Sequence, residues 1–124
     1  MAGNKFKQIL EQDPIFPSIL SASVWNENAL RKKQYVSKSV LNSSDGAFLP
    51  QFEAKQVKLA YHYPDRKSLI DYYDKSVIGV YWGKPQNALF YLGLIGKGYL
   101  TIVADGVTSA SDLISAGKRI QKKL

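Results

Sequence analysis

The only imidazole of the sequence, His62, is the first residue to consider for chemistry, because histidine titrates near neutral pH and serves as a general base or a metal ligand. It stands between Tyr61 and Tyr63. Nucleophilic catalysis also requires a nucleophile and an orienting partner within hydrogen-bond reach. Nothing in the sequence indicates such a set around His62, and a surface or hydrogen-bonded structural role explains a lone histidine. We therefore predict no catalytic residue.

Patterns for metal and cofactor binding are also missing from the sequence. It has no cysteine, which excludes disulfides, thiolate metal sites and cysteine nucleophiles. Asp71 and Asp74 could be neighbours on one helix face, where an ordinary charged surface explains them. Gly93, Gly96 and Gly98 lie between two apolar runs and indicate a hairpin turn, whereas a phosphate-binding loop needs a strand followed by a helix N-terminus. We predict no metal, no cofactor and no enzyme.

The chain is strongly basic, with 17 Lys and Arg against 10 Asp and Glu, a net charge of +7 and a pI near 9.6. This charge favours an acidic partner such as nucleic acid, an anionic membrane surface or an acidic protein face. The alternative is that it only maintains solubility. The 124 residues predict a single domain over 1–124. No apolar run approaches the ~20 residues that span a bilayer, and no signal peptide follows the start, so we expect a cytoplasmic protein.

Aromatic and basic residues are interleaved in two places, at Tyr61–Lys67 and at Tyr81–Lys84. Exposed rings beside cations stack bases in proteins that bind single-stranded nucleic acid. They also anchor protein interfaces, where Tyr, Trp and Arg concentrate binding energy. The alternative is that most of these rings belong to the core. The sequence leaves the three interpretations open.

Three apolar runs near the end of the chain predict a β-meander. The runs Ser76–Trp82, Ala88–Ile95 and Tyr99–Ala104 are rich in β-branched and aromatic residues and too short for buried helices. The turns between them are also short, and a parallel return would need a long crossover. We therefore expect antiparallel neighbours, followed by an amphipathic helix laid across them.

The expected terminal helix begins at an N-cap, Thr108 or Ser109, with Asp112 in its first turn. Its apolar positions recur at helical spacing and would cover the sheet: Ala110, Leu113, Ile114, Gly117, Ile120 and Leu124. Its last turns carry four cations, Lys118, Arg119, Lys122 and Lys123. These cations either complement the helix dipole or form a patch for an anionic lipid or another acidic partner.

The elements expected before the meander are less regular. We expect a short helix at Asn4–Gln12 and a strand at Ser18–Trp25, followed by either a helix or a strand at 26–41. We then expect a loop at Asn42–Gly46, a strand at Gln56–Tyr63 and a short helix at Pro64–Tyr73. The strand at Gln56–Tyr63 rests on alternation, with Val57, Leu59, Tyr61 and Tyr63 on one face.

This order of elements resembles the profilin family. Ser23-Val24-Trp25 resembles a motif of the second profilin strand, and Asp45–Leu49 followed by Val57–Tyr63 looks like a profilin strand pair. The segment Ala88–Thr108 is similar to the last profilin hairpin and its entry into the terminal helix. The resemblance implies an α+β fold: a central antiparallel β-sheet of about five to seven strands with the N- and C-terminal helices packed on it.

The same resemblance implies a small cytoplasmic, cytoskeletal protein that binds monomeric actin, regulates its polymerisation and binds phosphoinositides. By position, the actin-binding residues would be Lys58, Tyr81, Lys84, Asn87, Thr108 and Ser109. Polyproline binding is expected to be weak or absent, because the terminal helix has no aromatic residue and Trp25 is the one matching ring. A monomer is favoured over a homodimer.

A roadblock-type fold is the second resemblance, because that family also has a meander followed by a helix. It would imply a homodimeric scaffold. The chain departs from it at Asn26-Glu27-Asn28, where the family usually has an Asp-Gly hairpin. A basic protein that binds single-stranded nucleic acid is the third alternative.

Overall fold

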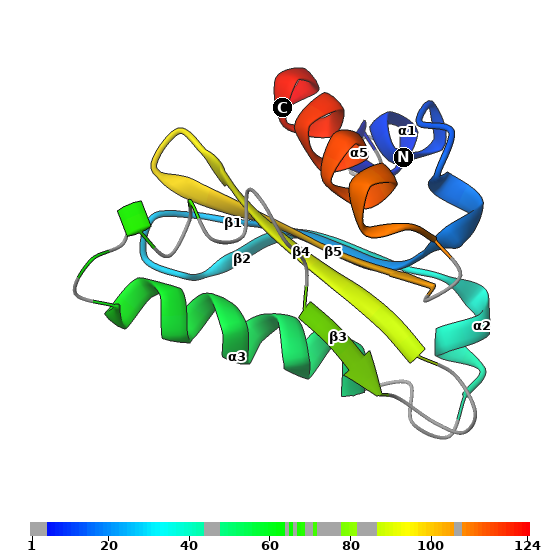
Figure 1. The fold of residues 1–124 in the computed structure, drawn as a ribbon, viewed down its shortest axis with the longest axis horizontal. Coiled ribbons are helices and arrows are strands. Elements are labelled where there is room, and N and C mark those ends of the chain that lie inside the picture. The colour runs from blue at the N-terminus through cyan, green and yellow to red at the C-terminus, as the bar shows by residue number, and fades with distance from the viewer. Residues whose placement is uncertain are drawn as a thin grey trace.

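The sheet at the centre of the molecule has five antiparallel strands in the order β2-β1-β5-β4-β3 (Figure 1). The computed structural model describes residues 5–43, 48–63, 65, 67–68, 71, 78–81, 87–105 and 108–124. The strands are β1 (Ile19–Trp25), β2 (Arg31–Val36), β3 (Ile78–Tyr81), β4 (Asn87–Ile95) and β5 (Gly98–Asp105). The α+β class is as expected. We expected about five to seven strands, and the described residues form five.

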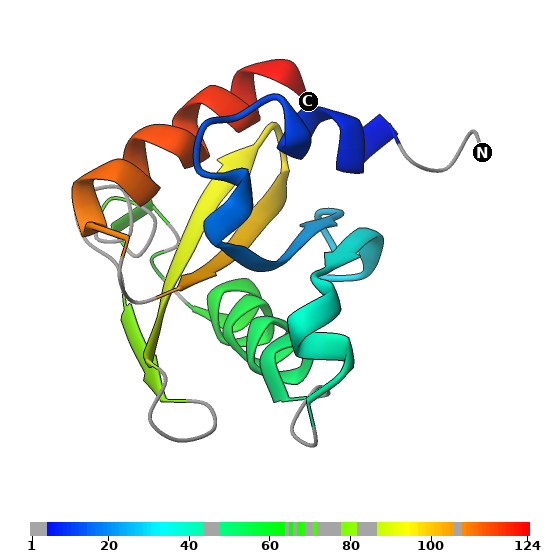
Figure 2. The same cartoon turned by 90° about the vertical axis from the view of Figure 1, so that its right-hand side faces the viewer.

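Helices cover both faces of this sheet. α1 (Lys5–Glu11) and α5 (Ala110–Lys123) lie together on one face, and α3 (Phe48–His62) lies on the other (Figure 2). α5 packs on β4 and β5, whereas α3 packs on β5 and β1. Two short elements complete the described fold, the 3-10 helix η2 (Phe16–Ser18) and α2 (Lys38–Leu41). Because both faces are covered, β5 is buried from Gly98 to Ala104 and the sheet is the middle layer.

Each face of the sheet has its own apolar core. On the α5 side the buried residues include Phe6, Leu10, Tyr91, Ile102, Leu113 and Ile120. On the α3 side they include Trp25, Leu49, Val57, Phe90, Leu92 and Val103. Burial of this apolar area is the main stabilising contribution to such a layered fold.

The meander and the helices at the two ends agree with the sequence expectation. β3, β4 and β5 are antiparallel neighbours, and α5 lies across β4 and β5. Ser109 is the N-cap of α5, since its hydroxyl accepts a hydrogen bond of 3.1 Å from the Asp112 amide. The segment 26–41, left open between helix and strand, contains β2 and then α2. Most of the helix expected at Pro64–Tyr73 and part of the loop at Asn42–Gly46 lie outside the described residues. Of the expected helix, the structure describes Asp65, Lys67, Ser68 and Asp71, and the last three are helical.

The strand expected at Gln56–Tyr63 is wrong, because all of these residues except Tyr63 belong to the long helix α3. The buried positions of α3 are Leu49, Glu53, Val57 and Ala60, which have the spacing of one helix face. Three of the four residues read as a strand face, Leu59, Tyr61 and Tyr63, are exposed. The profilin-like strand pair proposed for Asp45–Leu49 and Val57–Tyr63 is therefore wrong as well for its described residues, because Phe48 and Leu49 are also helical, while 45–47 lie outside the described residues.

Gly117 of α5 lies at a close contact between this helix and the sheet. A side chain at this position would overlap the ring of Tyr91 on β4. The helix therefore rests directly on the tyrosine ring, and a glycine is required at the contact even though glycine is a poor helix former.

We predict that overpacking in Gly117→Ala costs about 2–3 kcal/mol, the upper part of the usual range, because the added methyl group would overlap the Tyr91 ring. The better helix propensity of alanine recovers about 1 kcal/mol, so the free energy of unfolding should fall by about 1–2 kcal/mol. Urea unfolding measures the difference. Ser115→Ala, at an exposed position of the same helix, is the control and should change stability by less than about 0.5 kcal/mol. A Gly117→Ala variant as stable as the control would contradict the close contact.

Candidate functional site

A fully buried carboxyl group, that of Glu53, sits between α3 and the sheet. The hydroxyls of Ser21 and Ser23 on β1 donate hydrogen bonds to its two oxygens, at 3.2 and 3.1 Å. A buried carboxyl without partners would be strongly destabilising. These two hydrogen bonds form only when the Glu53 side of α3 is turned toward β1.

Arg31 of β2 extends the network around this carboxyl. One guanidinium nitrogen, Nη2, lies 3.5 Å from Glu53 Oε1 and donates a bond of 2.8 Å to the Pro50 carbonyl of α3. The Nε atom donates to Ser23 Oγ at 3.0 Å. The guanidinium also lies 4.3 Å from the centre of the Trp25 ring, a cation–π contact. The network thus ties α3 to β1 and β2 and fixes the rotation of the helix about its axis.

Burial raises the pKa of Glu53 to about 8, against the lowering effects of the Ser23 hydroxyl, the Arg31 charge and the Ser21 hydroxyl. A carboxyl group that stays protonated near neutral pH is one mark of a catalytic acid. Glu53, however, has no exposed surface through which a substrate could reach it. We therefore interpret this group as the structural anchor of α3.

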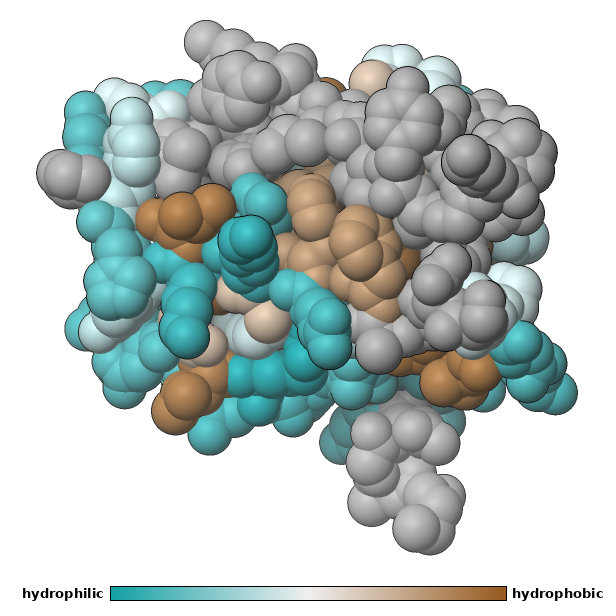
Figure 3. Space-filling view, turned by 90° about the horizontal axis from the view of Figure 1, so that it is seen from below, coloured by the Kyte–Doolittle hydropathy of each residue, from teal (hydrophilic) through white to brown (hydrophobic). Residues whose placement is uncertain are grey.

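One side of α3 carries apolar residues that are exposed or half-buried. Phe48, Phe52 and Leu59 are spaced i, i+4 and i+11 and form a stripe along the helix. We call these three residues the α3 stripe. Phe48 and Leu59 are 41% and 58% exposed, and the Phe52 ring meets the Phe90 ring of β4 edge-on with centroids 5.3 Å apart. The stripe therefore faces the β4 side of the sheet, and apolar surface is visible from below the molecule, among hydrophilic side chains (Figure 3).

Beyond β4 lies β3, the edge strand on that side of the described sheet. Its sequence, Ile78-Gly79-Val80-Tyr81, contains no charged residue. The opposite edge strand, β2, begins with three consecutive cations, Arg31-Lys32-Lys33. Charged residues, lysine above all, discourage one edge strand from pairing with another. The two edges of the sheet therefore differ in chemistry, and only the β3 edge lies beside the α3 stripe.

The residues implied as an actin-binding site belong, where the structure describes them, to elements on different faces of the sheet. Lys58 is exposed on α3, whereas Thr108 and Ser109 precede α5 on the other face of the sheet. Tyr81 and Asn87 are cross-strand partners in β3 and β4. Lys84 lies outside the described residues.

The four cations of α5 are not a uniform anion-binding patch. Arg119 donates two hydrogen bonds of 2.9 Å to the carboxylate of Asp13, and Lys123 Nζ lies 3.5 Å from Gln12 Oε1. These contacts join α5 to the end of α1. Lys118 and Lys122 are exposed on the same helix. At least half of the group thus contributes to helix packing.

The sequence interpretation missed the structural role of Glu53 and Arg31. Glu53 lies four residues after Leu49 and four before Val57, so a helical reading of this segment would have placed a carboxylate in the middle of an apolar face. Such a residue needs a buried partner, which is a usable signal. The alternation at Gln56–Tyr63 concealed it.

Within the described part of the chain, no group of three or more acidic or imidazole side chains could hold a metal ion. No helix in this part is long and apolar enough to cross a membrane. Among the features that the described residues offer to a partner are the exposed apolar side chains of α3 and the strand edge at β3.

Comparison with known proteins identifies the fold. No family model matches the chain, and no curated protein matches it in sequence. Among solved structures, an MglB with a tetrameric arrangement aligns with a TM-score of 0.59 at 12% identity, over 98% of this chain and 86% of that one. The gliding protein MglB of Thermus thermophilus aligns with a TM-score of 0.57 at 12% identity, over 97% and 85%. A Roadblock/LC7 domain from Streptomyces avermitilis aligns with a TM-score of 0.51 at 13% identity, over 94% and 88%.

These neighbours show a roadblock-type fold and correct the first resemblance. The profilin assignment is wrong, and the function it implied, actin-monomer binding in the cytoskeleton, is overturned with it. The neighbours give no support to phosphoinositide binding either. The roadblock resemblance, given as the second choice, is the one that the structure supports.

We predict that Glu53 makes the protein less stable as the pH rises. Its pKa in the folded state, about 8, lies above the ordinary value of 4.5, so the fold retains a proton that the unfolded chain loses between these values. The free energy of unfolding should fall across this window by at most about 1.4 kcal/mol per pH unit from this group. Urea unfolding at a series of pH values measures the slope.

Glu53→Gln should remove this part of the slope, because the amide keeps the hydrogen bonds and does not ionise. Glu27→Gln, which alters an exposed carboxylate, is the matched control and should retain the wild-type slope. Parallel curves for the wild type and Glu53→Gln would show that Glu53 does not hold a proton in the fold.

Proposed function

We propose that this protein is a roadblock-type scaffold, a homodimeric protein-interaction module without catalytic activity of its own. The observation that carries the proposal is the position of the α3 stripe beside the uncharged β3 edge. A dimer through this side would pair the edge strands and bury the stripe in one step.

Pairing of β3 with β3 of a second copy would continue the sheet across the dimer. Two identical strands related by a two-fold axis run antiparallel, the arrangement of every strand pair described in this sheet. The β2 edge is a poor alternative, because two copies would bring Arg31, Lys32 and Lys33 against the same cations. Charge thus favours β3 as the dimer edge.

The stripe supplies the hydrophobic contribution to such a dimer. Full burial of a leucine or phenylalanine side chain contributes about 1.5–3 kcal/mol, and each copy would bring both Phe48 and Leu59. Lys55 interrupts the exposed side of the helix between them. Its aliphatic stem can lie along the interface while the ammonium group remains in water.

The structural neighbours support assembly as a general expectation. One of them, an MglB, is described as having a tetrameric arrangement. That arrangement belongs to MglB, and for the present chain it makes self-association the first property to measure.

The mass in solution tests the proposal, by size-exclusion chromatography with light scattering. The wild-type protein should have about twice the 13.9 kDa mass of the chain. Leu59→Asp should give a monomer, because the new carboxylate would be buried in the interface without a partner. Tyr61→Asp is the matched control: Tyr61 is 44% exposed on the same helix, and its spacing of eleven residues from Pro50 places it on the Arg31 side.

The control variant should remain a dimer. Circular dichroism would establish that both variants keep the wild-type helix content. A monomeric wild type at micromolar concentration would contradict the proposed scaffold. Equal dissociation by Leu59→Asp and Tyr61→Asp would place the interface elsewhere.

A further inference from the structure

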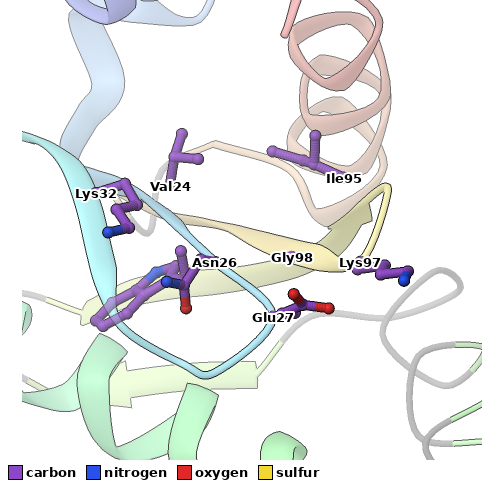
Figure 4. Close-up of a pocket in the computed structure, with 8 residues that line it drawn as sticks. Val24, Asn26, Glu27, Lys32, Ile95, Lys97 and Gly98 are labelled. Carbon is purple, nitrogen blue, oxygen red and sulfur yellow. The ribbon is translucent and has the colours of Figure 1, made fainter.

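A depression of about 370 Å³ lies where the turn between β1 and β2 meets the turn between β4 and β5 (Figure 4). Val24 and Ile95 line it with aliphatic side chains, which we call its floor, and Glu27, Lys32 and Lys97 are charged residues of its lining. Nothing in the scaffold proposed above uses these residues. The depression has the size of a small binding site.

The floor is apolar sheet surface that α5 leaves uncovered. Val24 and Ile95 are half-buried and pack against the α5-side core. α5 passes over Gly93, where a side chain would overlap Gln121 near the end of the helix. Ile95 lies two residues further along β4, toward the turn. The helix therefore ends before it covers this part of the sheet.

The rim of the depression is held rigidly. The side-chain oxygen of Asn26 accepts hydrogen bonds from the amides of Asn28 and Leu30, at 2.8 and 3.0 Å. Gly98 lies against the Trp25 carbonyl so closely that no larger residue fits. A rim fixed in this way loses little conformational entropy when a ligand binds.

Lys32 reaches the depression because of an irregularity in strand pairing. Val24 pairs with Lys33 and Trp25 pairs with Arg31, so Lys32 is an extra residue between them, as in a β-bulge. Bulges re-aim side chains and occur often beside functional sites. In the close-up, Lys32 lies beside Val24 on one hairpin, and Lys97 comes from the other (Figure 4).

We propose that this depression binds a protein segment in which an aliphatic side chain is flanked by carboxylates. The aliphatic group would cover Val24 and Ile95, and the carboxylates would approach Lys32 and Lys97. The net charge of +7 adds a long-range attraction for an acidic segment. The carboxylate of Glu27 would repel such a segment locally, so removal of this charge should strengthen binding.

This inference deepens the proposed scaffold function by naming the class of partner, and it uses a different surface. The depression lies at the sheet end on the α5 side, whereas dimerisation would use the α3 stripe and the β3 edge. A dimer of this kind would leave the depression open. Binding and self-association are therefore separable in one experiment.

Three synthetic peptides of the same length test the chemistry: Glu-Glu-Leu-Glu-Glu, Glu-Glu-Ser-Glu-Glu and Lys-Lys-Leu-Lys-Lys, with blocked ends. Each is titrated into the full-length, ¹⁵N-labelled chain, with the amide signals of Val24, Lys32 and Gly98 as the readout. The acidic leucine peptide should shift these signals and saturate. The serine peptide should bind about tenfold more weakly, because it lacks the apolar group, and the basic peptide should not bind.

Variants locate the site. Lys32→Glu should weaken binding of the acidic leucine peptide at least about fivefold, and Glu27→Gln should strengthen it, because the two changes alter the local charge in opposite directions. Lys58→Glu is the matched control, with the same change in net charge at an exposed position of α3. It should retain affinity within about a factor of two.

Equal loss in Lys32→Glu and Lys58→Glu would overturn the proposal, since it would show attraction to the overall charge only. Equal affinity for the leucine and serine peptides, or no shift at Val24 and Gly98, would also overturn it. Leu59→Asp should bind the peptide like the wild type. If the protein binds the peptide but is monomeric, the binding inference stands and the proposed dimer is wrong. If the protein is a dimer but does not bind the peptide, the proposed dimer stands and the binding inference is wrong.

Discussion

The buried carboxyl of Glu53 is the constraint on which the arrangement of this molecule depends. It cannot lie in an apolar core without donors, and its donors are the hydroxyls of Ser21 and Ser23 with the guanidinium of Arg31 beside them. α3 therefore has one permitted rotation on the sheet. That rotation points Phe52 at Phe90 of β4 and leaves Phe48 exposed on the same side. The polar anchor thus determines which apolar residues remain available to a partner.

Each part of the sheet that the helices leave uncovered has a distinct chemistry. The β2 edge is cationic and resists pairing with another copy, whereas the β3 edge is uncharged and lies beside the α3 stripe. The end of the sheet beyond α5 offers an apolar floor with lysines around it. A scaffold needs surfaces that do not compete with one another, and these regions lie on different sides of the molecule.

The sequence was sufficient to predict the elements of the C-terminal half of the fold and insufficient to predict the rest. Short turns required antiparallel strands, and the spacing of Leu113, Gly117 and Ile120 required a helix. The segment Phe48–His62 was misread because exposed Leu59 and Tyr61 mimic strand alternation. Profilin-like and roadblock-like chains share their late elements, so these elements could not separate the two resemblances, and the comparison with solved structures did. The pairing of Glu53 with Ser21, 32 residues away, could not be inferred from local pattern.

Hydrogen–deuterium exchange of the two edge strands, compared between dilute and concentrated protein, tests the central claim most directly. The account predicts that amides of Ile78–Tyr81 become protected as concentration rises, while amides of Arg31–Val36 exchange at the same rate in both samples. Protection of Arg31–Val36 instead, or exchange at both edges that does not depend on concentration, would contradict it.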